Sequence, residues 1–98
     1  MSNLENIIKS DKPVLAEFWA PWCTYCRRIN PALDKIADSR DDVLVVKVNI
    51  DEVPELARQE QIEVIPTLVV YKDGFELGSI VAPESKARID EFLREALQ

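Results

Sequence analysis

The sequence predicts an α/β fold, because apolar runs with strand character alternate with segments whose apolar residues recur at helical spacing. Its 98 residues, 47% hydrophobic and 31% charged, have the size and composition of a globular domain, and we expect one domain over residues 1–98. Two strand-like runs separated by a glycine-containing turn indicate a β-hairpin in the second half. The predicted order of elements is α-β-α-β-α-β-β-α.

The first helix is predicted from residue 2 to about residue 10. Ser2 and Glu5 have the spacing of a capping box, and Pro13 disfavours helix in the residue before it. Residues 14–19 form a short apolar run suited to a buried strand, and Glu17 is its single charged residue.

A longer helix follows, predicted from residues at helical spacing: Ile29, Leu33, Ile36 and Ala37. Residues 43–50 are rich in β-branched side chains and predict the second strand. Residues 53–59 predict a short helix, with Pro54 in its first turn, where proline is tolerated.

The last three elements are a hairpin and a helix. Residues 67–71 and 75–81 are strand-like, and Asp73-Gly74 supplies the positive-φ turn between them. Ser85 is the expected N-cap of the final helix. One face of that helix carries its apolar residues, namely Ile89, Phe92, Leu93, Ala96 and Leu97.

Charge and N-terminal composition restrict the function and the compartment. The formal net charge of −6 argues against a nucleic-acid surface, which would present clustered basic residues. The first residues lack the basic and apolar regions of a signal peptide, and no run approaches the roughly 18 apolar residues of a membrane span. We therefore expect a cytoplasmic protein that binds neither nucleic acid nor membrane.

Cys23 and Cys26 are the two cysteines of the chain, and their spacing allows a reversible disulfide. Because the thiolate is the nucleophile, a sulfur at a helix N-terminus is favoured by the helix dipole. Cys23 is therefore the expected attacking residue, and the deeper Cys26 the expected resolving residue. Half of a zinc site shared by two chains is the alternative, but structural zinc takes four Cys or His ligands and the chain has no histidine. We expect no metal.

The second exchange step needs a proton acceptor for Cys26. Glu17 is the candidate, because burial in an apolar strand raises the pKa of a carboxyl group. Glu17 is alternatively an edge residue that extends its carboxylate into solvent. Lys47 either points to solvent or pairs with Glu17. Trp22 either faces the substrate or packs against the protein.

At this point the chain resembles the thioredoxin family over residues 4–97. The stretches that carry the resemblance are Phe18-Trp19-Ala20-Pro21-Trp22-Cys23-Thr24-Tyr25-Cys26, Pro31-Ala32-Leu33-Asp34-Lys35-Ile36-Ala37, Lys47-Val48-Asn49-Ile50-Asp51 and Ile65-Pro66-Thr67. The resemblance implies a central mixed sheet flanked by helices, and a cis Pro66 whose loop faces the cysteines. It implies that the main chain of Ile65 pairs with an extended client. It implies a substrate groove lined by Trp22, Cys23, Ile65, Pro66, Thr67 and, in the third loop, Ala82.

Several positions depart from the family pattern. Thr24 and Tyr25 replace the usual Gly-Pro between the cysteines and, with Lys47, are expected to tune the redox properties. Glu17 is one methylene longer than the usual Asp, and Ala82-Pro83 stands where a glycine is usual. The chain opens at the family's first helix, so we expect four, possibly five, strands. Residues 43–50 would then be an exposed edge, which predicts a monomer, a weak dimer or a protecting crossover.

The leading functional expectation is a protein-disulfide reductase, a thioredoxin-type electron carrier. Its redox group would be the Cys23–Cys26 disulfide with no bound cofactor, its substrates client proteins with disulfides, and its recycling partner an NADPH-dependent thioredoxin reductase. One alternative is a more oxidising, narrower thiol oxidoreductase or isomerase with a glutaredoxin-like poise. Another is a binding module that uses the fold as a scaffold.

Overall fold

The computed structural model describes residues 9–98, so the helix start expected at Ser2 and Glu5 lies outside the described residues. The strands are β1 (Val14–Trp19), β2 (Leu44–Asn49), β3 (Thr67–Lys72) and β4 (Phe75–Val81), and the helices are α2 (Thr24–Ser39), α3 (Pro54–Gln59) and α4 (Lys86–Ala96). Each corresponds to an element predicted from the sequence, with ends that differ by a few residues.

The four strands form one mixed sheet in the order β2-β1-β3-β4. β1 runs parallel to β2 and antiparallel to β3, and β4 returns antiparallel beside β3. This arrangement confirms the expected mixed sheet, and within residues 9–98 β2 is an edge strand as expected. Because β1 has a neighbour on each side, Glu17 stands in the sheet interior, opposite Lys47 on β2 and Leu68 on β3.

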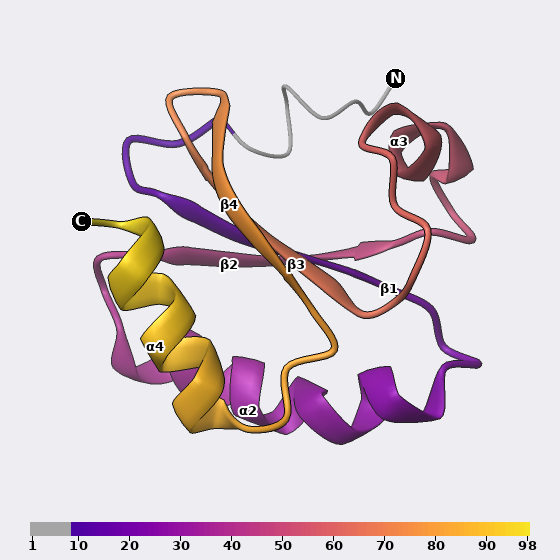
Figure 1. The fold of residues 1–98 in the computed structure, drawn as a ribbon, viewed down its shortest axis with the longest axis horizontal. Coiled ribbons are helices and arrows are strands. Elements are labelled where there is room, and N and C mark those ends of the chain that lie inside the picture. The colour runs from indigo at the N-terminus through magenta and orange to yellow at the C-terminus, as the bar shows by residue number, and fades with distance from the viewer. Residues whose placement is uncertain (1–8) are drawn as a thin grey trace.

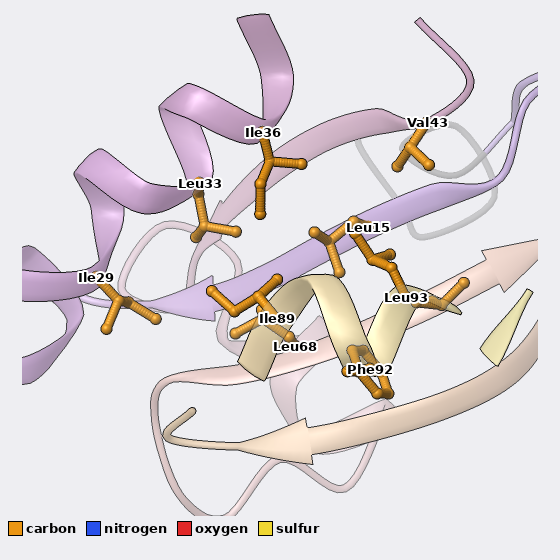
Figure 2. Packing of buried hydrophobic residues seen from close by; sticks show 10 residues of the cluster. Leu15, Ile29, Leu33, Ile36, Val43, Leu68, Ile89, Phe92 and Leu93 are labelled. Atoms are coloured by element: carbon orange, nitrogen blue, oxygen red, sulfur yellow. The ribbon is translucent and has the colours of Figure 1, made fainter. Parts of the chain in front are cut away.

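Helices cover both faces of the sheet. Figure 1 shows α2 and α4 together on one face and α3 on the other. Each face has its own apolar core. The core beneath α2 and α4, drawn in Figure 2, comprises Leu15, Ile29, Leu33, Ile36, Val43, Leu68, Val70, Ile89, Phe92 and Leu93. The core beneath α3 comprises Val14, Ala16, Phe18, Val48, Leu56, Val69 and Tyr71. Alternate residues of β1 therefore serve opposite cores, as the period of a strand requires.

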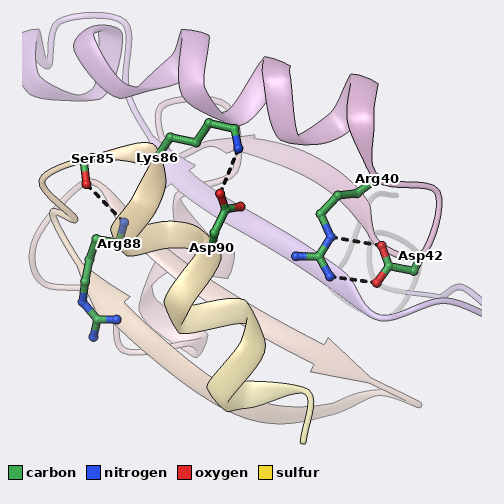
Figure 3. A network of polar contacts seen from close by, with 6 residues as sticks. All are labelled: Arg40, Asp42, Ser85, Lys86, Arg88 and Asp90. Atoms are coloured by element: carbon green, nitrogen blue, oxygen red, sulfur yellow. Dashed lines mark hydrogen bonds and ion pairs between the residues drawn. The ribbon is translucent and has the colours of Figure 1, made fainter.

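Polar contacts fix the ends of α2 and α4 (Figure 3). Ser85 is the N-cap of α4, as predicted, and its Oγ accepts a hydrogen bond of 3.1 Å from the main-chain N–H of Arg88. Just after α2, the Arg40 guanidinium donates to both carboxylate oxygens of Asp42, at 3.0 and 2.7 Å. The cap stabilises a helix end by about 1 kcal/mol, whereas an exposed ion pair contributes less.

The hairpin turn has the backbone that its residues predict. Asp73 and Gly74 have φ values of 54° and 83°, the left-handed pair that a two-residue turn between twisted strands requires. Thr67 begins β3 directly after Pro66, so the turn lies at the opposite end of the hairpin from Pro66. In residues 9–98, no helix combines the length and the hydropathy needed to cross a membrane.

Candidate active site

Cys23 and Cys26 form a disulfide at the N-terminus of α2, with their Cα atoms 5.3 Å apart. Cys23 is the N-cap residue, in extended conformation, and its Sγ accepts a hydrogen bond of 3.2 Å from the main-chain N–H of Cys26. The cap sulfur therefore occupies the position where unpaired N–H groups and the helix dipole favour negative charge. Cys26 is fully buried, whereas Cys23 is half-buried.

The loop before β3 faces the cysteines. The Ile65–Pro66 peptide bond is cis, as the family resemblance implied. The carbonyl oxygen of Ile65 lies 4.0 Å from Cys23 Sγ. Pro66 is buried, and the buried Thr67 donates its hydroxyl hydrogen bond to the carbonyl of Val64. The Ile65 main chain is thus held beside the half-buried sulfur.

Trp22 is an exposed aromatic beside the disulfide, with 65% of its surface accessible. Its indole N–H donates to the carboxylate of Asp51, with distances of 3.0 and 3.2 Å to the two oxygens. Of the two interpretations left open, packing is therefore wrong for Trp22. One exposed hydrogen bond orients the ring while its face remains open to a partner.

The loop between β4 and α4, which is the third loop of the predicted groove, forms hydrogen bonds with the loop before β3 and with the segment between the cysteines. The N–H of Ala82 donates to the carbonyl of Pro66 at 2.8 Å, and the Tyr25 hydroxyl donates to the carbonyl of Pro83 at 2.9 Å. Tyr25 is half-buried and packs against the core, while Thr24 is exposed. Ala82 has a φ of 46°, a left-handed conformation that explains why glycine suits this position. A residue between the cysteines thus fastens the third loop.

Glu17 is fully buried in the central strand β1. The interpretation that its carboxylate extends into solvent is therefore wrong. Burial raises the pKa of Glu17 to about 7, because leaving water disfavours the charged carboxylate. The positive charge of Lys47 lowers this pKa and the negative charge of Asp34 raises it, both by less than burial does.

Lys47 is an exposed residue, as one of its two interpretations held, and its ion-pair partner is Asp34 rather than Glu17. Its ammonium donates to the carboxylate of Asp34 on α2 at 2.7 Å. The ion pair is partly exposed, with 30% of the Lys47 side chain accessible. Lys47 therefore influences Glu17 through its charge, and Asp34 offsets part of that influence.

Asn30 is the residue at this site that sequence reasoning missed. Its amide is oriented by its neighbours, since the opposite orientation would set its oxygen against three other oxygens. The amide nitrogen donates to the carbonyl of Cys26 at 2.9 Å and faces the two Glu17 oxygens at 2.8 and 2.9 Å. The signal was present as a spacing of four: Cys26, Asn30 and Asp34 lie on one face of α2.

The arrangement has the parts that disulfide exchange needs. One cysteine is half-buried at a helix N-terminus, and the other is fully buried. The structure brings the predicted groove residues to the surroundings of the accessible sulfur: Trp22, Ile65, Pro66, Thr67 and Ala82. On the buried side, a carboxyl group with a pKa of about 7 is linked through an amide to the main chain of Cys26.

Comparisons with known proteins agree with this chemistry. The Thioredoxin family model matches residues 1–95. The chain is 43% identical to "Thioredoxin 1" of Synechococcus elongatus over 94 residues, which cover 95% of this chain and 88% of that protein. It is 39% identical to "Thioredoxin" of Alicyclobacillus acidocaldarius over 98 residues, covering 99% and 93%. It is 42% identical to "Thioredoxin" of Mycobacterium tuberculosis over 85 residues, covering 86% and 73%.

Proposed function

The chain belongs to the thioredoxin family of protein-disulfide oxidoreductases, and we propose that it acts as a general reductase of protein disulfides in the cytoplasm. The observation that carries the proposal is the contrast between its sulfurs. Cys23 is partly accessible at the cap of α2, and Cys26 is buried. This contrast suits an exchange in which one sulfur meets the client and the other closes the reaction.

In the first step the Cys23 thiolate attacks one sulfur of a client disulfide. A Cys23–client disulfide forms, the client disulfide breaks, and the departing client sulfur takes up a proton. The hydrogen bond from the Cys26 N–H, together with the helix N-terminus, supports the assignment of Cys23 as nucleophile. Both features stabilise the thiolate more than the thiol.

In the second step Cys26 attacks the sulfur of Cys23. The Cys23–Cys26 disulfide forms, and the second client sulfur leaves as a thiolate that is then protonated. The client gains two electrons and the pair loses two, so the pair carries the electrons with no bound cofactor. We assign Glu17 as the acceptor of the Cys26 proton, because a buried carboxyl group with a pKa of about 7 suits proton transfer near neutral pH. Lys47 and its partner Asp34 adjust that pKa.

The client is held beside Cys23 by main-chain and surface contacts. An extended client segment pairs with the main chain of Ile65, in the manner of an added strand. Trp22, Thr67 and Ala82 contact the segment on either side, and the buried Pro66 shapes the loop. None of these contacts reads a particular side chain, which favours many clients over one. Recycling requires a partner that delivers two electrons, and we assign this to an NADPH-dependent thioredoxin reductase.

Two features favour a second candidate, a more oxidising thiol oxidoreductase. Stabilising the Cys23 thiolate makes a disulfide easier to reduce. Tyr25, which replaces the usual proline, also fastens the third loop through Pro83. Both features concern the residues between or at the cysteines, which is where the reduction potential is set.

The deciding experiment measures the reduction potential of the Cys23–Cys26 pair in equilibrium with glutathione. A general reductase requires a value close to the roughly −270 mV of thioredoxin, and a value near −200 mV or above would contradict it. A coupled assay with NADPH, a thioredoxin reductase and a disulfide-containing client then tests turnover. The Cys26→Ser variant is the control, because it retains the attacking sulfur but cannot complete a cycle.

A further inference from the structure

A polar column runs along one face of α2, from the buried Cys26 through the half-buried Asn30 to the exposed Asp34. Cys26, Asn30 and Asp34 are spaced by four residues on this face. The column meets two charged side chains from neighbouring strands: Glu17 on β1 lies at Asn30, and Lys47 on β2 lies at Asp34. Asn30 is the only member of the column that contacts both the resolving cysteine and Glu17 in the described residues.

We propose that Asn30 is a positioning residue of the exchange reaction, which holds the Glu17 carboxylate against the main chain of the resolving Cys26. This inference rests on the proposed function of Glu17 and adds a residue to it. Asn30 does not touch a reacting sulfur in the contacts described, so it acts through Glu17.

The hydrogen bonds that the Asn30 amide donates support this role. An amide nitrogen has two hydrogens. One is directed to the carbonyl of Cys26 at 2.9 Å, and the other lies between the two Glu17 oxygens at 2.8 and 2.9 Å. The two oxygens are therefore held at nearly equal distances from a donor fixed to α2. A carboxylate accepts such a hydrogen bond better than a carboxylic acid does, so Asn30 favours the charged form of Glu17.

Three other influences act on the pKa of Glu17 and can be separated from that of Asn30. Burial disfavours the charged form, Lys47 favours it and Asp34 disfavours it. Asn30 therefore opposes the effect of burial with a neutral group. A neutral donor permits a charged Glu17 in the sheet interior without placing a second full charge beside the disulfide.

The length of Glu17 matches a donor at this distance. An Asp carboxylate at position 17 would end about 1.5 Å closer to β1, by one carbon–carbon bond, and would move away from the Asn30 nitrogen. The longer acid and the amide on α2 therefore form a matched pair. This pairing gives a structural reason for the longer acid, Glu17, at a position where the family usually has Asp.

The direct test is the titration of the Glu17 side-chain carboxyl carbon by NMR in the full-length oxidised protein. Asn30→Leu replaces the amide with an apolar group of similar size. We expect the Glu17 midpoint to rise by about one pH unit, because one charge-assisted hydrogen bond is lost. Asp34→Asn, one turn further on the same face, is the matched control. In Asp34→Asn the Glu17 midpoint should fall, since the substitution removes a negative charge and frees Lys47. An unchanged or lower midpoint in Asn30→Leu would overturn the proposal.

A measurement on the unaltered protein covers the case in which Asn30→Leu does not fold. The side-chain NH₂ resonances of Asn30 should shift with pH at the midpoint of Glu17, since its hydrogen bond strengthens as the carboxyl group ionises. Resonances that do not respond to the Glu17 titration would contradict the contact on which the proposal depends.

Kinetics then connect the contact to the reaction. The pH profile for release of the Cys23–client disulfide should move upward in Asn30→Leu by the same amount as the Glu17 midpoint. In a Glu17→Gln background, Asn30→Leu should change release by less than about 2-fold, because coupled residues are not additive. If Glu17→Gln alone left release unchanged, the proton-acceptor assignment would fail, while the titration would still decide the role of Asn30. A full additive effect in the Glu17→Gln background would show that Asn30 does not act through Glu17.

Discussion

The two sides of the disulfide are built differently. The outer side is assembled mainly from loops and consists of Trp22, residues 65–67 and Ala82-Pro83, where the main-chain carbonyls of Pro66 and Pro83 accept hydrogen bonds. The inner side is assembled from regular elements and consists of Cys26 and Asn30 on α2 and Glu17 on β1. Main-chain contacts on the outer side suit varied clients, and fixed side chains on the inner side suit one repeated proton transfer. The two steps of the proposed exchange divide in the same way. The client is attacked on the outer side, and the Cys26 proton is accepted on the inner side.

The largest effects should separate the two sulfurs. Cys23→Ser should abolish both mixed-disulfide formation and turnover, while the serine hydroxyl still caps α2. Cys26→Ser should abolish turnover but accumulate the Cys23–client disulfide, because the first step needs only the outer sulfur. Non-reducing mass spectrometry after mixing with a client distinguishes the two. Turnover retained in Cys23→Ser would remove the nucleophile assignment. Biological function retained in Cys23→Ser without disulfide-reducing turnover would favour a binding module.

The inner side should leave a signature in stability. An unfolded Glu has a pKa of about 4.3, whereas the pKa of folded Glu17 is about 7. As pH rises between these values the unfolded chain releases a proton that the folded chain retains. The free energy of unfolding therefore falls, by about 4 kcal/mol in total. Glu17→Gln lacks this contribution. It should be more stable than the unaltered protein at pH 8 by up to that amount.

Urea unfolding of the oxidised proteins at pH 4 and pH 8 provides the measurement. The remaining carboxyl groups titrate alike in both proteins and cancel in the difference. A stability difference that does not grow with pH would show that Glu17 is not a buried acid of this kind.

Tyr25 connects the two sides through the hydrogen bond of its hydroxyl, and removing that hydrogen bond should have a moderate effect. Tyr25→Phe deletes the hydrogen bond to the Pro83 carbonyl and keeps the ring in the core. The free energy of unfolding should fall by about 1 kcal/mol, and the KM for peptide disulfides should rise while release of the mixed disulfide is unchanged. Thr24→Ala is the control, because Thr24 is exposed. Slower release of the mixed disulfide in Tyr25→Phe would mean that this hydrogen bond also affects the inner side.

The smallest effect concerns the outer loop alone. Ala82 has a left-handed backbone with a φ of 46°, which costs a residue with a Cβ about 1 kcal/mol. Ala82→Gly should raise the free energy of unfolding by about 0.5 kcal/mol, once the greater freedom of unfolded glycine is counted. Ala87→Gly, at an exposed helical position, should instead lower it by about 1 kcal/mol. Thermal unfolding of both variants gives the comparison.

The elements were predictable because each is encoded within a short stretch. The apolar run of β1, the apolar spacing in α2 and the Asp73-Gly74 turn all act locally. The partners of the polar side chains could not be predicted, because they depend on how α2 lies across the sheet. Asn30 and Asp34 are polar residues on a helix, and such residues usually face water. Only the packing of α2 brings them to Glu17 and Lys47. The groove residues were predicted through family resemblance rather than through local chemistry.

The hairpin tip has a practical consequence for finding clients. β3 runs from Thr67, beside Pro66, to Lys72, so at about 3.3 Å per residue the turn lies about 20 Å from the groove end of the strand. Phe75, just after the turn, is 72% exposed. A biotin or a solid support attached at this tip leaves the disulfide unobstructed. Cys26→Ser anchored there can be used as an affinity reagent that recovers clients as covalent adducts.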